Sequence, residues 1–214
     1  LTQPKSMLPV AGRPFIDWQL VLLRRVGFDA CLLCVGHFAE VIEAHVGDGS
    51  KYGLRVAYSH EGPERLGTGG ALRRALPQLE DDFVLTYGDS YLPYDYLAPL
   101  RVLRAHADAE VVMSVFHNQN ALEPSNVALG EGRVTRYEKG RSDSGLDYID
   151  YGALAVRRRF VEAMPEGKSD LSAALMRAVA AGTVRAAEAS RRFFEVGSPA
   201  GLAALEHELR EQQR

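Results

Sequence analysis

Hydrophobic positions change period along the first half of the chain. Residues 14–26 place apolar side chains at helical spacing, and Gly27 stands where that helix should end. Residues 29–35 are almost continuously apolar, which predicts a short strand buried on both faces. The same criteria predict further helices over residues 38–46, 69–76 and 94–106, and further strands over residues 54–58, 82–87 and 110–117.

This alternation of strands and helices predicts an α/β fold with a doubly wound, mostly parallel, Rossmann-like sheet. The second half follows another pattern, because strand-like pieces come in succession over residues 126–129, 133–138 and 148–156. Two helices and a strand pair then follow, and the last helix is expected from residue 199 to about residue 212. We therefore expect a single domain over residues 1–214, with a small β-rich subdomain in its second half.

Composition narrows the class of protein. The chain has 214 residues and a formal net charge of -3, so no basic field favours nucleic acid as a partner. No apolar run approaches the roughly 20 residues of a membrane span, and no secretory signal opens the chain. Cys31 and Cys34 lie in an apolar strand, where we expect two small buried side chains. Nothing indicates an oxidising compartment, so a cytoplasmic protein is expected.

The chain opens without a strand, whereas a doubly wound sheet normally begins with one. We therefore expect residues upstream of Leu1 in the natural protein. An intact mass more than about 1 kDa above 23.5 kDa would support that expectation.

Two charged residues at strand and loop ends are candidates for catalysis. Asp89 follows a hydrophobic strand in Tyr87-Gly88-Asp89-Ser90, where a carboxylate suits a divalent metal ion. A turn with a capping aspartate is the alternative. Lys5 lies between two prolines that stiffen its segment, so it would suit a phosphate. An ordinary exposed loop lysine is the alternative.

Three further segments carry candidate contacts. A glycine-rich turn opens a helix with Leu66, Gly67, Thr68, Gly69 and Gly70, and its backbone would suit a nucleotide base. It is not a Walker A loop, because no Gly-Lys-Ser/Thr follows. Glu138 and Lys139 follow a short strand and would suit a sugar phosphate, or form a solvated ion pair in a hairpin. Glu195 ends an apolar strand before a helix and would be a second metal ligand, or an N-terminal helix charge.

Other reaction classes have little support in the sequence. The six histidines do not stand at metal-ligand spacing, and no Gly-x-Ser-x-Gly elbow of a serine hydrolase is present. A dinucleotide-dependent oxidoreductase would need a Gly-x-Gly-x-x-Gly loop after the first strand, which these residues lack.

Taken in order, these motifs resemble the sugar-1-phosphate nucleotidyltransferase family from Leu1 to about Leu205. The most specific stretch is LTQPKSMLPVAGRPFIDWQL. The resemblance implies Mg²⁺ as cofactor, bound by Asp89 and Glu195, with Lys5 on phosphate. It further implies base recognition by residues 66–70 and sugar-phosphate contacts by Glu138 and Lys139.

Several positions depart from the family pattern. Glu195 stands where aspartate is usual, which lengthens the ligand arm by one methylene. Asp150 and Asn126 stand where relatives have other residues, and both become candidate sugar contacts. The family's signature loop, with its arginine, would precede Leu1.

The resemblance implies that the domain has three parts: a nucleotide-binding core over residues 1–120, a sugar-binding part over 121–198 and a C-terminal helix over 199–214. The expected reaction joins a nucleoside triphosphate to a sugar 1-phosphate, giving a nucleotide sugar and pyrophosphate. The resemblance is closest to short heptose-1-phosphate guanylyltransferases and N-acetylmuramate-1-phosphate uridylyltransferases, and the activity we expect is that of a heptose- or mannose-type 1-phosphate guanylyltransferase. Alternatives are N-acetylmuramate- or glucose-1-phosphate uridylyltransferases, or a catalytically inactive regulator that binds nucleotide sugars. An exposed apolar helix face would allow a homodimer.

Overall fold

The computed structural model describes residues 3–138 and 145–212, so Lys139 lies outside the described residues. The chain forms two compact units. Unit 1 is built from the described residues of Leu1–His60, Tyr87–Pro93 and Phe193–Arg214, and unit 2 from those of Glu61–Thr86 and Tyr94–Arg192. Each unit thus gathers segments that are distant in sequence, and each is described separately below.

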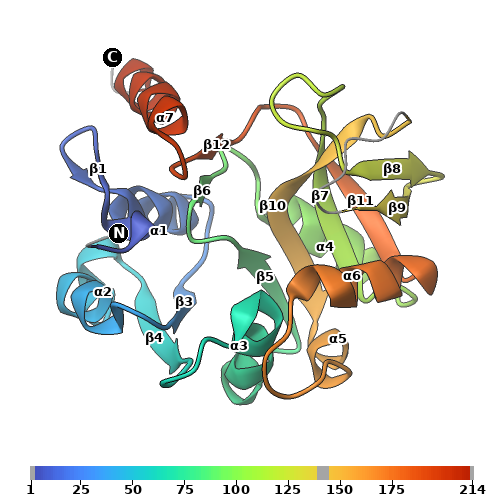
Figure 1. Cartoon of the computed structure of the whole chain (residues 1–214), viewed down its shortest axis with the longest axis horizontal. Helices are drawn as coiled ribbons and strands as arrows, with labels where there is room; N and C mark the ends of the chain where they lie inside the picture. The colour runs from blue at the N-terminus through green and yellow to red at the C-terminus, as the bar shows by residue number, and fades with distance from the viewer. Residues whose placement is uncertain (1–2, 139–144, 213–214) are drawn as a thin grey trace. The chain divides into compact units, whose positions relative to one another are not determined.

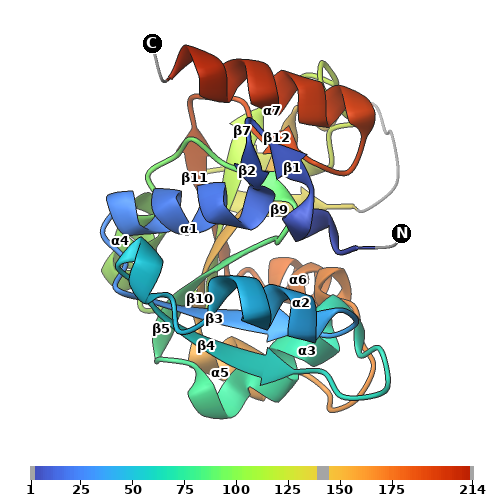
Figure 2. The ribbon, with the colours of Figure 1, turned by 90° about the vertical axis from the view of Figure 1, so that its left-hand side faces the viewer.

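Unit 1 combines short helices with three two-stranded sheets. Its elements are η1 (Lys5–Met7), β1 (Pro9–Val10), β2 (Arg13–Pro14), α1 (Phe15–Arg25), β3 (Ala30–Val35), α2 (Ala39–Val46), η2 (Ser50–Tyr52), β4 (Arg55–His60), β6 (Ser90–Tyr91), β12 (Phe194–Glu195) and α7 (Pro199–Glu211). Strands β3 and β4 are parallel, whereas β1 pairs with β2 and β6 with β12 in antiparallel fashion. Figure 2 shows β3 and β4 side by side.

The core of unit 1 lies where α1 and α2 meet the β3–β4 pair. Ile16 and Leu20 of α1 are buried with Val46 of α2. Cys31 and Leu33 of β3 pack against this cluster, and so do Val56 and Tyr58 of β4. The residues of each strand in contact are two apart, so one face of the pair points into the core.

Helix α1 ends as the sequence predicts. Gly27 adopts φ 105°, and its N–H donates to the carbonyl of Arg24 at 3.1 Å. The N–H of Phe28 donates to the carbonyl of Leu23 at 3.1 Å. These two bonds form a Schellman motif, in which glycine takes the left-handed position at no steric cost.

Unit 2 contains the larger sheet. Its elements are α3 (Gly67–Ala75), η3 (Leu76–Gln78), β5 (Asp82–Thr86), α4 (Leu97–Ala105), β7 (Val111–His117), β8 (Val127–Gly130), β9 (Arg133–Tyr137), β10 (Tyr148–Arg157), α5 (Arg158–Glu162), α6 (Leu171–Ala180) and β11 (Val184–Ala189). The strand order is β5-β10-β7-β11-β9-β8. In Figure 1, α4 lies behind this sheet and α6 in front of it.

The predicted α/β class and the β-rich second half are confirmed. Strands β7 and β11 are parallel, but β10 runs antiparallel between β5 and β7, so the sheet of unit 2 is mixed. The long β10 strand has this place because its residues are apolar on both faces: Tyr151–Val156 are all buried. Such a strand is most stable in the middle of a sheet with helices on both sides.

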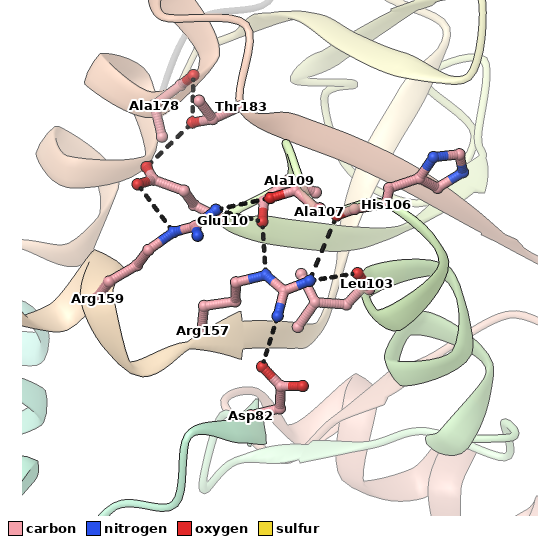
Figure 3. Close-up of polar contacts among 10 residues, drawn as sticks. All are labelled: Asp82, Leu103, His106, Ala107, Ala109, Glu110, Arg157, Arg159, Ala178 and Thr183. Atoms are coloured by element: carbon pink, nitrogen blue, oxygen red, sulfur yellow. Dashed lines mark hydrogen bonds and ion pairs between the residues drawn. The ribbon is translucent and has the colours of Figure 1, made fainter.

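A partly buried arginine ties β10 to the end of α4 (Figure 3). The guanidinium of Arg157 donates to the carbonyls of Ala109 at 2.9 Å and of Leu103 at 2.8 Å, and to the carboxylate of Asp82 at 3.1 Å. Leu103 is in the last turn of α4, and its carbonyl also accepts from the amide of His106 at 3.2 Å. Arg157 therefore adds a second donor at that helix end and links it to β5.

Strand β3 is less buried than its sequence predicts. Ala30 and Cys34 are exposed, because β4 is the neighbour of β3 within the described part of the chain. The prediction of two buried cysteines is therefore wrong for Cys34, while burial raises the pKa of Cys31 to about 11. No helix within residues 3–138 and 145–212 has the length and apolar character needed to cross a membrane.

Candidate active site

Lys5 and Asp89 meet in unit 1, although 84 positions separate them in sequence. The ammonium of Lys5 donates to Asp89 Oδ2 at 3.1 Å. Both side chains remain open to solvent, with exposed fractions of 45% and 36%. The carboxylate thus faces a cation and does not cap a helix. This geometry favours a role in a charged binding site for both Lys5 and Asp89, over a capping aspartate and an ordinary loop lysine.

The strand pair β6–β12 brings Glu195 to the same place. Glu195 pairs with Ser90, and the N–H of Val196 donates to the carbonyl of Asp89 at 3.0 Å. Glu195 and Asp89 therefore occupy neighbouring positions on two paired segments. The helix that follows is capped by the hydroxyl of Ser198, which accepts from the N–H of Gly201 at 3.0 Å. The hydrogen-bonding cap of this helix is thus Ser198, and the alternative of Glu195 as an N-terminal helix charge stays open.

Space remains open at Gly88, which precedes Asp89 in the chain. A Cβ built on Gly88 would meet no atom of the described chain within 4 Å, and Gly88 does not need a positive φ. Neither packing nor backbone strain explains glycine at this position. A Cβ on Gly197 would lie 3.5 Å from Lys5 Nζ, so Lys5 passes close over the backbone after Glu195.

Asp89 and Glu195 are the residues of unit 1 that would hold a divalent metal ion. Both supply carboxylate oxygens, the donors that a hard cation such as Mg²⁺ prefers. The ammonium already drawn to Asp89 indicates that its oxygens attract a cation. Within the described residues no three acidic, histidine or cysteine side chains gather into a complete metal site. Substrate phosphates would therefore have to supply further ligands, as is common for Mg²⁺.

The glycine-rich turn of unit 2 is docked on the segment before α6. The amides of Gly69 and Gly70 donate to the carbonyl of Ser169 at 3.0 and 3.3 Å, and the amide of Ser169 donates to the carbonyl of Leu66 at 2.9 Å. The hydroxyl of Thr68 accepts from the amide of Leu171 at 3.0 Å. Two helix starts, those of α3 and α6, are thereby joined.

This packing explains the three glycines that the sequence suggested for a ligand. Gly67 adopts φ 71°, and a Cβ on it would lie 2.6 Å from the carbonyl oxygen of Ser169. A Cβ on Gly70 would lie 2.3 Å from the carbonyl oxygen of Gly167, and one on Gly69 would lie 2.7 Å from Ser169 Oγ. The amides of Gly67 and Thr68, at the start of α3, make no hydrogen bond within the described part of the chain. Those two donors are the part of the turn that still points to ligand binding.

Asn126 and Asp150 interact in unit 2, where β10 changes register. Asn126 Oδ1 accepts from the amide of Asp150 at 2.8 Å. Asp150 Oδ1 accepts from the amide of Gly152, which adopts φ 87°, and Oδ2 accepts from Tyr137 at 3.4 Å. Burial and the Asp150 carboxylate raise the pKa of Tyr137 well above its ordinary value. The carboxylate of Asp150 thus stabilises the irregular strand.

Glu138 joins the same group, because its amide donates to the carbonyl of Asn126 at 2.9 Å. Its Oε1 accepts from Arg136 at 2.7 Å. Its Oε2 is buried and has no hydrogen-bond partner within the described part of the chain. A buried carboxylate oxygen without a donor is costly, and a ligand hydroxyl would satisfy it.

The structure thus brings the predicted residues together in two groups. Lys5, Asp89 and Glu195 are grouped in unit 1, and Asn126, Glu138 and Asp150 in unit 2, which also carries Leu66, Gly67, Thr68, Gly69 and Gly70. Lys139 lies outside the described residues.

Sequence reasoning missed one residue beside Asp89. Gln19 of α1 donates from Nε2 to the carbonyl of Tyr87 at 3.0 Å and to that of Ser90 at 2.9 Å. Its only sequence signal is a polar residue between the buried Trp18 and Leu20.

Residues 1–186 match the family model described as MobA-like NTP transferase domain. The chain belongs to this family. Transferases of the family typically use a divalent metal ion. The relatives of this NTP transferase domain are sugar-1-phosphate nucleotidyltransferases, which confirms the resemblance drawn from the motifs.

Two relatives match most of the domain. The UTP–glucose-1-phosphate uridylyltransferase of Synechocystis sp. is 27% identical over 182 residues, which cover 78% of this chain and 47% of that protein. The mannose-1-phosphate guanylyltransferase of Mycobacterium tuberculosis is 29% identical over 169 residues, with the same two shares. The chain therefore spans about half the length of these curated relatives.

A solved structure confirms the fold. The structure of HddC from Yersinia pseudotuberculosis complexed with GMP-PN superposes with a TM-score of 0.80 at 23% identity, over 96% of this chain and 90% of that one.

Proposed function

We propose that this domain transfers a nucleotidyl group from a nucleoside triphosphate to a sugar 1-phosphate. A phosphate oxygen of the sugar phosphate attacks the α-phosphorus, and the bond from that phosphorus to the β-phosphate breaks. The products are a nucleotide sugar and pyrophosphate. The observation that carries the proposal is the Lys5–Asp89 pair with Glu195 on the neighbouring strand, within a chain of the NTP transferase family.

The proposed roles follow from charge. Both substrates are anionic, so the domain has to neutralise phosphate oxygens and align them. Lys5 would bind triphosphate oxygens, and Asp89 with Glu195 would hold Mg²⁺. When bound, Mg²⁺ supplies positive charge to the phosphates. Lys5 would contact triphosphate oxygens instead of Asp89 when the metal site is filled, because Lys5 and a cation would compete for the same carboxylate.

Unit 2 would bind the base and the sugar. The amides of Gly67 and Thr68 are the free donors of the glycine-rich turn, and we assign the base to them. We assign the sugar hydroxyls to Glu138 Oε2, with Asn126 and Asp150 beside it, and the sugar phosphate to Lys139.

We favour a heptose- or mannose-type guanylyltransferase. The Mycobacterium tuberculosis relative is named for mannose 1-phosphate and guanylyl transfer, and the HddC structure holds GMP-PN. The Synechocystis relative makes a uridylyl enzyme the main alternative. A cytoplasmic location and a homodimer both stay predictions.

The test is a pyrophosphate-release screen on the natural protein with Mg²⁺. Four nucleoside triphosphates are crossed with glucose, mannose, N-acetylglucosamine, N-acetylmuramic acid and heptose 1-phosphates. We expect release with one pair, involving GTP and a mannose- or heptose-type sugar. Silence together with tight triphosphate binding by calorimetry would point to an inactive regulator instead. Silence with no binding would contradict the proposal.

A further inference from the structure

We propose that Gln19 is a positioning residue for the metal-binding carboxylate: it fixes the backbone on both sides of Asp89 so that the carboxylate stays directed at the cation. The proposal rests on the function proposed above. It concerns a residue that contacts neither substrate nor metal and acts through Asp89.

The geometry of the contact is specific to glutamine. Gln19 Nε2 donates to the carbonyl of Tyr87 at 3.0 Å and to the carbonyl of Ser90 at 2.9 Å. These two carbonyls bracket Gly88 and Asp89, so one amide group closes the turn that carries the carboxylate. Glutamine offers two N–H donors on one nitrogen, whereas glutamate would present oxygens to the same carbonyls.

The turn needs such support, because its own sequence does not make it rigid. Gly88 lies next to Asp89 and has the greatest backbone freedom of any residue. A Cβ on Gly88 would meet no described atom within 4 Å, so packing does not restrain it either. The turn has one internal bond, from the amide of Ser90 to the carbonyl of Tyr87 at 3.4 Å. The shorter Gln19 bonds act with it and with the Val196–Asp89 bond at 3.0 Å to hold this segment.

Gln19 is itself held on a rigid element. Helix α1 has a buried face that includes Phe15, Ile16 and Leu20. The neighbouring Trp18 donates from its indole nitrogen to the carbonyl of Val10 at 2.9 Å.

The same helix also fixes the segment that carries Lys5. The amide of Phe15, at the start of α1, donates to the carbonyl of Leu8 at 2.9 Å. The amide of Leu8 in turn donates to the carbonyl of Lys5 at 3.0 Å. Helix α1 is therefore bonded to both segments whose charged side chains meet at 3.1 Å.

Loss of the Gln19 bonds should change metal affinity more than the chemistry at saturation. Without them the Asp89 carboxylate would sample more orientations, and an incoming metal ion would have to order the turn. We expect Gln19→Leu to raise the half-saturating Mg²⁺ concentration about tenfold or more, the scale of losing one to two net hydrogen bonds. Turnover should largely recover at saturating Mg²⁺.

The experiment measures two quantities on the natural protein: pyrophosphate release as a function of Mg²⁺, and Mn²⁺ binding with triphosphate by electron paramagnetic resonance. Val21→Ala, an exposed position on the same helix, is the matched control and should leave both unchanged. Gln19→Asn keeps the amide but shortens the arm by one methylene, so it should lose part of the metal affinity. It serves as the second variant if Gln19→Leu does not fold, with folding checked by thermal unfolding.

A purely structural role would lower the unfolding temperature and leave the metal dependence of the folded protein unchanged. Folded Gln19→Leu or Gln19→Asn with wild-type Mg²⁺ and Mn²⁺ dependence would overturn the positioning role alone, provided that the wild type binds Mn²⁺ and turns over. A wild type that neither binds Mn²⁺ with triphosphate nor releases pyrophosphate would overturn the proposed function and this proposal with it.

Discussion

Glu138 has one carboxylate oxygen bonded to Arg136 and a second, buried oxygen without a partner in the described part of the chain. At the residue scale this oxygen is the hydrogen-bond acceptor best suited to a substrate hydroxyl. Glu138→Gln replaces one carboxylate oxygen with an amide and so weakens acceptance from a hydroxyl. We expect the KM for the sugar 1-phosphate to rise about tenfold, which corresponds to about 1.4 kcal/mol. The KM for the triphosphate should stay unchanged.

Steady-state kinetics with each substrate varied in turn checks this. Glu131→Gln, at an exposed turn of the same hairpin, is the control and should behave as wild type. Equal increases in both KM values, or none, would speak against a sugar contact at Glu138.

Single residues differ in how far the sequence predicts them. Lys5 and Asp89 were predicted because each belongs to a motif whose place in the chain is informative. The bonds of Gln19 join it to residues 68 and 71 positions away, and no local pattern encodes such a contact. The sequence predicts Asp150 as a sugar contact, which stays a prediction, and the structure shows its carboxylate bonded to the amide of Gly152 in a bulged strand.

At the scale of elements, single alanine substitutions distinguish a glycine that packing requires from a glycine that leaves space for a ligand. Gly70→Ala would place a methyl 2.3 Å from the carbonyl oxygen of Gly167, so we expect a loss of about 1–3 kcal/mol in the free energy of unfolding. Gly88→Ala meets no neighbour and should change stability by no more than about 0.5 kcal/mol. Its methyl would intrude on the open space at Gly88, which precedes Asp89, so kcat/KM should fall at least about tenfold.

Urea unfolding and pyrophosphate release, measured on both variants, test the pair. Wild-type activity in Gly88→Ala would mean that the open space beside it is not used by substrate. Wild-type stability in Gly70→Ala would mean that the two helix starts can separate at little cost.

The junction of β10, β5 and α4 depends on Arg157 (Figure 3). Its side chain is 20% exposed and donates to three carbonyls, those of Leu103, His106 and Ala109, and to Asp82. Arg157→Met removes all of these donors at once, and the charged Asp82 keeps only the longer contact with Arg104 at 3.6 Å among the described residues. We expect a loss of about 2–4 kcal/mol in the free energy of unfolding, measured by urea.

Arg159→Met is the matched control, because Arg159 is 50% exposed and pairs with Glu110 nearby. It should cost less than about 1 kcal/mol. Equal losses in the two variants would contradict the special role of Arg157.

The sequence predicted most elements to within a few residues, because their apolar periods are clear and glycines such as Gly27 end them. The sequence does not predict the direction of β10, because a strand that is apolar on both faces has the same sequence pattern in parallel and antiparallel sheets. The sequence predicts the glycine-rich turn as a ligand loop, whereas packing against residues 167–171 explains its three glycines. A glycine in the sequence does not reveal whether a ligand or another backbone segment approaches it closely.

At the scale of the whole molecule, the linear division into a core over residues 1–120 and a sugar-binding part over 121–198 stays a prediction. The two compact units are assembled from interleaved segments, and Asp89 and Glu195 reach unit 1 from separate parts of the chain. Long-range packing determines which segments return to a unit after the chain has left it. Local sequence patterns do not contain this information. The order of motifs nonetheless indicated the family that the comparison confirmed.

The most direct test of nucleotidyl transfer by this molecule is to quantify pyrophosphate and nucleotide sugar together, for the natural protein and for Asp89→Ala. The account predicts equal amounts of the two products with Mg²⁺, none with excess EDTA, and at least about a hundredfold lower turnover in Asp89→Ala. Asp95→Ala, an exposed aspartate paired with Arg101, should keep wild-type turnover. Near wild-type turnover in Asp89→Ala, or pyrophosphate without nucleotide sugar, would contradict it.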